Sequence, residues 1–475
     1  MAEAAGAPAP THRTPTLAVA LLPLVVMAAL LGVGYGVYHI RAQILLVCAA
    51  AFTGCVGWAL GYRWSELLDG IVDSIRKAMP AILIMLCVGL LIGSWITCGT
   101  IPMVMYYGLK IISPQYFLVT ACVVCTVTAL ATGTSWGTIG TLGVALMGIA
   151  IALGIPAGPA AGAIVAGSYM GDKISPFSDI PNLAPIAAGS NLFDTIKHMM
   201  WSAVPAWLIG LGIYLLIGLR YGATARETAG LTTVTDALRA HFTFGWSLLL
   251  PMVVVFAFAF AKKPVIPGMI LSVAIAGVLA LAVQGSTVVQ FATALNTGFV
   301  ASTGDPTVDR LLSRGGMMSM METQLIAFTA FAFGGIMQRT GLLALLLERV
   351  MRFARRTWSL VVTTVTAAVT TALVTGSSYL SILIPGELLA PVYRKQQLAA
   401  KNLARIVVES GGIIVPLVPW SMAGVYITGT IGVPTLEYLP WAFMNYLSVG
   451  VLIIYGATGF TMAPKIREDE TQIGS

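Results

Sequence analysis

Long apolar segments separated by short polar connections constrain this chain more than any other feature of its sequence. The hydrocarbon core of a bilayer is about 30 Å thick, so a helix needs about 20 consecutive apolar residues to cross it. Segments of this length recur along the 475 residues. Charged residues make up only 9% of the chain, whereas a soluble domain carries about 25%. So much apolar surface cannot be buried in one globular core, and the sequence predicts an all-α polytopic membrane protein.

Some of the apolar segments are continuous and others are broken. The broken regions, 116–155, 159–188 and 357–430, are interrupted by Gly, Pro, Ser and Thr. Irregular backbone at membrane depth persists only where protein or a water-filled cavity satisfies its polar groups, and such breaks are typical of transporter binding sites. We expect about ten full spans plus two hairpins. The continuous segments are 16–38, 42–61, 78–98, 200–219, 246–261, 264–283, 318–338 and 441–461.

Lys and Arg in the connections predict the orientation, because the cytoplasmic loops of membrane proteins carry the excess of these residues. The excess falls on one side only if 116–155 and 357–393 each enter and leave on the same side, as re-entrant helical hairpins. Both chain ends then lie in the cytoplasm, and the loops 220–245 and 285–315 lie outside. This topology accounts for the net charge of +7 without a nucleic acid partner. We expect a multi-pass protein of a bacterial inner membrane.

Two related strings indicate an internal repeat. Residues 128–136 read Thr-Ala-Leu-Ala-Thr-Gly-Thr-Ser-Trp, and residues 371–379, which start 243 positions later, read Thr-Ala-Leu-Val-Thr-Gly-Ser-Ser-Tyr. The same spacing joins Pro176-Phe-Ser to Pro419-Trp-Ser. The two copies begin on opposite sides in the predicted topology, so they form an inverted repeat. Inverted repeats place a substrate site near the bilayer midplane, where the copies meet.

The repeat divides the chain into segments. They are a disordered tail (1–15), an N-terminal helical pair (16–61), the first repeat (62–219, with the hairpin 116–155 and the broken helix 159–188), connecting loops with two spans (220–309), the second repeat (310–461, with the hairpin 357–393 and the broken helix 402–430) and a cytoplasmic tail (462–475). The helical stretches 101–112 and 340–356 occupy matching places, and we expect them to lie on the membrane surface.

The predicted hairpin tips are rich in hydroxyl groups around a glycine that permits a sharp turn. Hydroxyl and carbonyl oxygens can replace the hydration shell of a hard cation such as Na⁺, whereas amides at the N-terminus of a half-helix suit an anionic group. The alternative is close helix packing through small residues. The candidate ligands are Thr132, Thr134, Ser135 and Thr138 in the first tip, and Thr375, Ser377 and Ser378 in the second.

Two carboxylates and an ammonium group follow an apolar stretch without any loop, in the segment 171–182. Charged groups at this depth are costly and indicate function. A carboxylate that binds H⁺ and Na⁺ alternately produces antiport, so Asp172 and Asp179 are the candidate titrating ligands. Alternatively, Lys173 neutralises Asp172 as a structural pair. The polar neighbours Ser175, Ser178 and Asn182 complete this group of candidates.

The second copy has no counterparts of these aspartates, because valine and methionine stand at the equivalent positions. Its candidate charges are Glu387, in the second arm of the hairpin, and Glu409, and its candidate polar ligand is Ser421. Arg405 lies four residues before Glu409, so a local ion pair is the alternative interpretation of that glutamate.

No metal site or catalytic site is predicted. The six cysteines lie in or beside apolar segments, and Cys122-x-x-Cys125 has neither a second cysteine pair nor a histidine cluster to accompany it. We interpret these cysteines as helix-packing residues. The sequence shows no nucleophile with its base, so a membrane-embedded enzyme is disfavoured, and the paired broken segments disfavour a passive channel. We expect no cofactor beyond the transported Na⁺ and H⁺.

The chain resembles the NhaC family of Na⁺/H⁺ antiporters, within the ion transporter superfamily. The resemblance is carried by Ala131-Thr-Gly-Thr-Ser-Trp-Gly-Thr, Gly171-Asp-Lys-Ile-Ser-Pro-Phe-Ser-Asp, Asn182-Leu-Ala-Pro and Pro416-Leu-Val-Pro-Trp. It implies two inverted repeats, each with a re-entrant hairpin and a broken helix. It also implies homodimers that work by an elevator movement of the hairpin domain against a scaffold.

The chain departs from the family pattern beside the expected ligands. Ile180-Pro181 stand where the family has Thr-Thr, Glu409-Ser-Gly-Gly stand where it has Asp-Ser-Gly-Thr, and Ser421 stands where it has Asn. The leading prediction is Na⁺/H⁺ antiport by alternating access, at a site enclosed by the two tips, 171–182 and 410–421. Because several changes remove polar groups, proton- or sodium-coupled exchange of small organic acids or amino acids stays open.

Overall fold

The fold was described from a computed structural model, which covers residues 12–35, 37–38, 40–224, 228–304, 306–354 and 356–464. This part of the chain is helical, and its one β-bridge joins Leu398 to Pro464. Nine of its helices are long and apolar enough to cross a membrane, or up to twelve if each of three bent helix pairs is one span. The polytopic all-α class is confirmed. Most of the predicted tails, 1–15 and 462–475, lies outside the described residues.

The two predicted copies of the repeat contain long helices in a similar order. The first copy has α3 (Trp64–Thr97), α4 (Thr100–Ile111), α5 (Phe117–Thr132), α6 (Ser135–Thr138) with η3 (Ile139–Gly143) and α7 (Val144–Ala152), α8 (Ala157–Ile174), α9 (Asp179–Ala188) and α10 (Leu192–Thr224). The second copy has α16 (Met317–Arg339), α17 (Leu342–Met351), α18 (Thr357–Thr375), α19 (Ser378–Lys395), α20 (Ala400–Val407) with η5 (Val408–Gly412) and η6 (Val415–Leu417), α21 (Met422–Ile431), α22 (Thr435–Tyr438) with η7 (Leu439–Trp441), and α23 (Phe443–Thr458).

Other helices precede the first copy or connect it to the second. The N-terminal pair is α1 (Leu17–Ala29), continued by η1 (Leu30–Tyr35), and α2 (Ala42–Ala59). The connection contains α11 (Thr228–His241), η4 (Trp246–Leu249) with α12 (Leu250–Phe260), α13 (Val265–Ala282), α14 (Val288–Asn296) and α15 (Pro306–Leu312). The connection 220–245 was expected to be a loop, and α11 occupies much of it. The sequence prediction identified helices by long apolar segments. It therefore missed α11, which is rich in threonine and contains charged residues.

Each predicted hairpin turns at a glycine. The helix α5 ends at Gly133 (φ 70°) and α18 ends at Gly376 (φ 61°), both in the left-handed conformation that glycine adopts without a steric penalty. The next helix of each hairpin begins with a hydroxyl N-cap, because Thr134 accepts a hydrogen bond from the Gly137 amide and Ser377 accepts one from the Leu380 amide. The chemistry of the turn is therefore repeated at the 243-residue spacing.

The broken helices also share their local construction. The helix α8 ends before Pro176 and α9 begins after the N-cap Ser178, while α20–η6 and α21 are separated by a 45° bend before the N-cap Ser421. Proline cannot donate the backbone hydrogen bond that a continuous helix needs at its position, so the chain breaks near Pro176 and Pro419. A proline therefore lies at each break, whereas α10 and α19 continue through Pro205 and Pro385.

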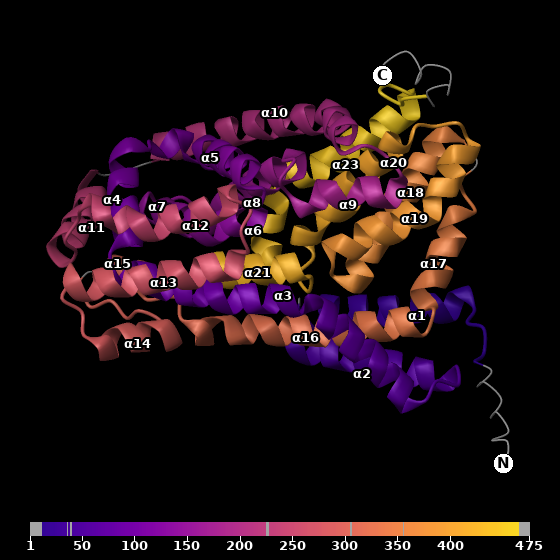
Figure 1. Ribbon diagram of the computed structural model, residues 1–475, viewed down its shortest axis with the longest axis horizontal. Coiled ribbons are helices and arrows are strands. Elements are labelled where there is room, and N and C mark those ends of the chain that lie inside the picture. The colour runs from indigo at the N-terminus through magenta and orange to yellow at the C-terminus, as the bar shows by residue number, and fades with distance from the viewer. Residues whose placement is uncertain are drawn as a thin grey trace.

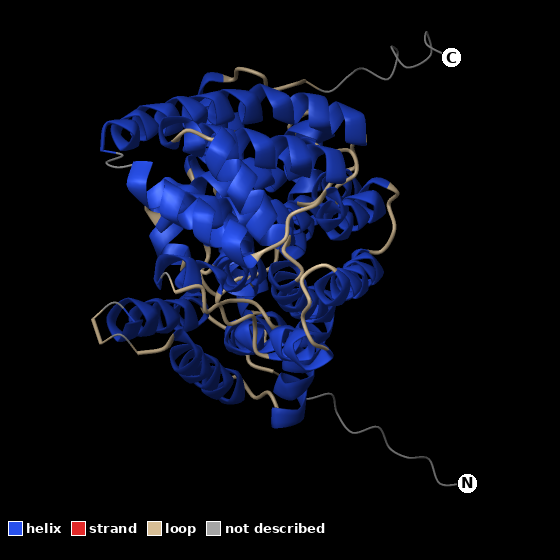
Figure 2. Cartoon of the chain, turned by 90° about the vertical axis from the view of Figure 1, so that its left-hand side faces the viewer, coloured by secondary structure: helices blue, strands red, loops and turns tan. Residues whose placement is uncertain are grey.

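The arrangement of the helices brings the breaks to the interior. In Figure 1, α3 and α16 lie side by side along the long axis, and α2 and α13 pack against them. The first hairpin, α5–α7, lies toward the left end of this view and the second, α18–α19, toward the right end. Figure 2, turned by 90°, shows helices joined by loops throughout the described chain. The breaks of α8–α9 and α20–α21 lie between the two hairpins.

Glycines set the close contact between α5 and α8 that positions the first break. A Cβ at Gly171 would lie 2.6 Å from the Leu130 amide nitrogen of α5, and one at Gly167 would collide with the carbonyl group of Cys122. Small residues let two helices approach to backbone contact inside a membrane. The residue after Gly171 is thereby held against the tip of the first hairpin.

Candidate ion-binding site

Asp172 is a buried carboxylate at the meeting point of the first hairpin tip and the first broken helix. It lies in the last turn of α8, and its side chain is 6% exposed. The hydroxyl group of Ser135, at the start of α6, donates a hydrogen bond of 2.6 Å to Asp172 Oδ2. The structure thus brings together two of the predicted ligands, which are 37 positions apart in the chain.

Other predicted ligands near the breaks bond to the backbone there. Ser175 Oγ donates to the Leu130 carbonyl group (2.7 Å), and Asn182 Nδ2 donates to the carbonyl groups of Pro176 and Ser178 (3.2 and 2.6 Å). In the second copy, Ser421 Oγ donates to the Val415 carbonyl group (2.6 Å). Irregular backbone in a membrane needs such partners. Ser178 Oγ likewise accepts from the Ile180 amide.

The hydroxyl groups of Thr132, Thr138 and Thr375 bond within their own hairpins. Thr132 donates to the Thr128 carbonyl group and Thr375 donates to that of Thr371. Thr138 donates to the carbonyl group of Thr134, and the carbonyl group of Ser378 accepts from Ser381. In the described chain, Ser135 is therefore the tip residue whose hydroxyl group bonds to Asp172. A second cavity, between the first tip and the α12–α13 turn, is lined by Thr132, Thr134, Gly137, Val255, Phe256, Ala259 and Val265.

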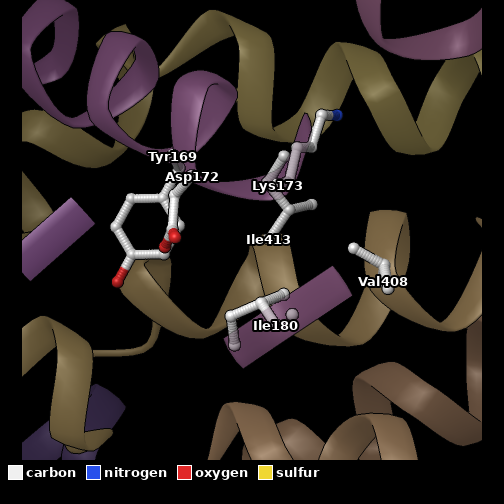
Figure 3. Close-up of a pocket in the computed structure, with 7 residues that line it drawn as sticks. Tyr169, Asp172, Lys173, Ile180, Val408 and Ile413 are labelled. Carbon is white, nitrogen blue, oxygen red and sulfur yellow. The ribbon is translucent and has the colours of Figure 1, made fainter. Parts of the chain in front are cut away.

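Lys173 pairs with the second copy of the repeat. Its Nζ lies 3.1 Å from Glu409 Oε1 and donates to Ser448 Oγ at 3.0 Å, with the two charged side chains 3% and 0% exposed. Figure 3 shows Lys173 directed away from Asp172. The sequence suggested two local ion pairs, Lys173 with Asp172 and Arg405 with Glu409, and neither is formed. Lys173 pairs with Glu409 instead, and Arg405 donates to Thr461 Oγ1 at 2.8 Å.

The other two predicted carboxylates lie in more open positions. Asp179, at the start of α9, is exposed and accepts a hydrogen bond of 3.2 Å from the hydroxyl group of Tyr379 on α19. This is a second contact between the two copies. Glu387 is exposed on α19 and does not line the cavity beside Asp172. Burial therefore separates Asp172 and Glu409 from Asp179 and Glu387.

A small cavity lies beside Asp172, between α8, α9 and η5. Figure 3 shows its lining, in which Ile180 and Ile413 supply apolar walls. Tyr169 also lines the cavity, and its hydroxyl group is buried without a hydrogen-bond partner in the described chain. Sequence reasoning missed Tyr169, although its position three residues before Asp172 puts both on one helix face. The lining residues are Tyr169, Asp172, Lys173, Ile180, Val408, Gly412 and Ile413.

The site provides oxygen ligands rather than a transition-metal set. Within the described residues, no three His, Cys, Asp or Glu side chains group so that they could hold a metal ion. A single carboxylate with hydroxyl groups suits a hard monovalent cation or a proton, and it lacks the imidazole and thiolate ligands that zinc or copper prefers.

Comparison with known proteins agrees with this chemistry. The sequence model of the Na⁺/H⁺ antiporter family matches residues 16–180 and 167–460. The chain belongs to this family. An uncharacterized Na⁺/H⁺ antiporter of Haemophilus influenzae is 42% identical to it, over 95% of this chain and 98% of that protein. The Na⁺/H⁺ antiporter NhaC of Alkalihalophilus pseudofirmus is 36% identical, over 94% and 96%.

The relatives of this chain are named for different substrates. The arginine/ornithine antiporter ArcD of Halobacterium salinarum is 34% identical, over 97% of this chain and 96% of that protein. The resemblance to NhaC antiporters deduced from the sequence is confirmed. So is the prediction of a transmembrane transport protein.

Proposed function

We propose that this protein exchanges Na⁺ for H⁺ across a bacterial inner membrane, with Asp172 as the carboxylate that binds both ions in turn. The observation that carries the proposal is the burial of Asp172 against the first hairpin tip, where Ser135 bonds to one carboxylate oxygen. A buried carboxylate is stable only when a proton or a cation neutralises it. Two cations that compete for one negative charge are exchanged rather than carried together.

We further propose that the hairpins and broken helices of two inverted repeats move as one body against α3 and α16, in an elevator-type cycle. The contacts Lys173–Glu409 and Tyr379–Asp179 support a single body, because each joins one copy to the other. The shared element order and the opposite ends taken by the hairpins in Figure 1 support the inverted repeat.

The test is exchange in proteoliposomes with an acidic lumen and an enclosed pH dye. External NaCl should make the lumen alkaline with saturable kinetics, while KCl and choline chloride should not. The apparent KM for Na⁺ should rise as the external pH falls, because protons compete for the same carboxylate. Asp172→Asn, which keeps the shape but removes the charge, should abolish the response. The proposal would be overturned if the wild-type protein gave no alkalinisation of the lumen when NaCl is added.

Exchange of small organic acids or amino acids is the second candidate. The apolar walls supplied by Ile180 and Ile413, and the similarity to an arginine/ornithine antiporter, favour it over other classes. The same vesicles would receive a panel of amino acids and carboxylates. A response to one of these compounds in place of Na⁺ would establish this candidate and make Ile180 a specificity residue.

A further inference from the structure

Tyr169 lines the cavity beside Asp172 and has a buried hydroxyl group. The side chain is 6% exposed, and its oxygen is buried without a hydrogen-bond partner in the described chain. Figure 3 shows the Tyr169 and Asp172 side chains on the same side of α8. Nearly all buried polar groups in folded proteins have a partner, so a group without one calls for a reason.

Packing alone does not account for the hydroxyl group. Phenylalanine would fill the same volume without burying an unsatisfied polar atom, which costs about 1–3 kcal/mol. Other buried tyrosines of this chain have partners: Tyr393 contacts Thr364 Oγ1 at 3.0 Å, and Tyr214 donates to the Trp441 carbonyl group at 2.6 Å. Tyr169 differs from them in having no such partner and in lining a cavity beside a carboxylate.

We propose that the Tyr169 hydroxyl oxygen is a direct ligand of the transported Na⁺, together with the carboxylate of Asp172. This inference rests on the proposed function. A phenol oxygen offers a neutral lone pair to a cation and adds no charge to the site. It therefore replaces part of the hydration shell of Na⁺ while leaving Asp172 as the single charge for which H⁺ competes. Tyr169 becomes a determinant of Na⁺ affinity rather than of proton coupling.

The experiment compares wild type, Tyr169→Phe, Asp172→Asn and the control Tyr393→Phe. The control removes the hydroxyl group of an equally buried tyrosine that has a partner and does not line the cavity. Two quantities are measured for each purified protein. The first is the thermal unfolding temperature in detergent, in NaCl and in choline chloride of equal ionic strength. The second is the KM and maximal rate of Na⁺-driven exchange in proteoliposomes.

Tyr169→Phe should unfold in choline chloride at the wild-type temperature or above it, since it loses no hydrogen bond. Its stabilisation by NaCl should largely disappear. Its KM for Na⁺ should rise about tenfold, the usual effect of losing one contact to a charged group, with the maximal rate changed by less than about twofold. Tyr393→Phe should show the opposite pattern, a lower unfolding temperature with an unchanged KM.

The outcomes separate this proposal from the proposed function. If wild type responds to Na⁺ and Tyr169→Phe keeps its KM and its stabilisation by NaCl, the ligand role of Tyr169 is wrong and the antiport stands. If Tyr169→Phe is unstable in choline chloride with an unchanged KM, its role is structural and the proposal is likewise wrong. If wild type shows neither exchange nor stabilisation with Na⁺, both proposals are overturned.

Discussion

Lys173 and Glu409 form a buried ion pair, 3.1 Å between Nζ and Oε1, that joins α8 to η5. The lysine directly follows Asp172 in the chain, so the pair fixes the helix that presents the candidate ion ligand. Its surroundings are polar, because Lys173 also donates to Ser448 on α23. The pair therefore connects the helix that carries Asp172 to η5.

Removal of one member of this pair should be far more damaging than removal of both. Lys173→Met or Glu409→Met leaves an uncompensated buried charge and should lower the unfolding free energy by about 3–5 kcal/mol. The double variant should recover most of this loss, because no charge remains buried. Thermal unfolding in detergent measures each variant.

The matched control is the exposed pair of Glu348 and Arg352, whose atoms are 3.3 Å apart. Its single and double methionine variants should each change the unfolding free energy by less than about 1 kcal/mol, since water screens exposed charges. A double variant of the buried pair that is as unstable as either single variant would show that Lys173 and Glu409 do not act on each other.

The tip of the first hairpin should tolerate no side chain at Gly133. A Cβ there would lie 2.7 Å from the Phe177 carbonyl carbon, whereas nothing lies within 4 Å of a Cβ at Gly189. Both glycines are left-handed, with φ of 70° and 75°, so alanine costs about 1–2 kcal/mol at either position. Gly133→Ala should lose a further 1–3 kcal/mol, approximately, from the collision.

The measurement is thermal unfolding together with Na⁺-driven exchange for Gly133→Ala and Gly189→Ala. Exchange should fall sharply for Gly133→Ala and persist for Gly189→Ala. The Cβ at position 133 would collide with Phe177 and push the hairpin tip away from the end of α8, which carries Asp172. Equal losses in the two variants would mean that the backbone conformation, and not the close contact, accounts for the effect.

Asp179 should matter less than Asp172, because it is exposed and already bonded to the Tyr379 hydroxyl group. Asp172→Asn should abolish exchange, while Asp179→Asn should retain it at a reduced rate. Tyr379→Phe removes the same hydrogen bond and should reduce the rate to a similar extent. Because the two residues act through one contact, the double variant should be no worse than either single variant.

Initial rates of exchange at saturating Na⁺ decide this prediction, with the unfolding temperature as a check on folding. An Asp179→Asn protein that is folded and as inactive as Asp172→Asn would make Asp179 a second ion ligand, as the sequence alone suggested. Additive losses in Asp179→Asn and Tyr379→Phe would show that the contact between them is not used.

The sequence by itself determined the class of the protein, the glycine turns after α5 and α18, and the places where α8 and α20–η6 end. These features are local. The length of an apolar segment decides whether it can cross a membrane, and a glycine followed by a hydroxyl residue, as at Gly133-Thr134 and Gly376-Ser377, sets a turn and the N-cap after it. Pro176 and Pro419 lie at the two breaks, although α3 and α10 continue through Pro80 and Pro205.

Only the tertiary structure decided which polar groups face one another. Lys173 directly follows Asp172 in the chain. It nevertheless pairs with Glu409, which is 236 positions away. Nothing in the sequence distinguishes Tyr169 within the apolar stretch of α8, and only the packing of α8 against α9 and η5 makes it line a cavity beside Asp172. Burial depends on which helices pack together, and that choice is made by the sum of many weak contacts across the whole chain rather than by any local pattern.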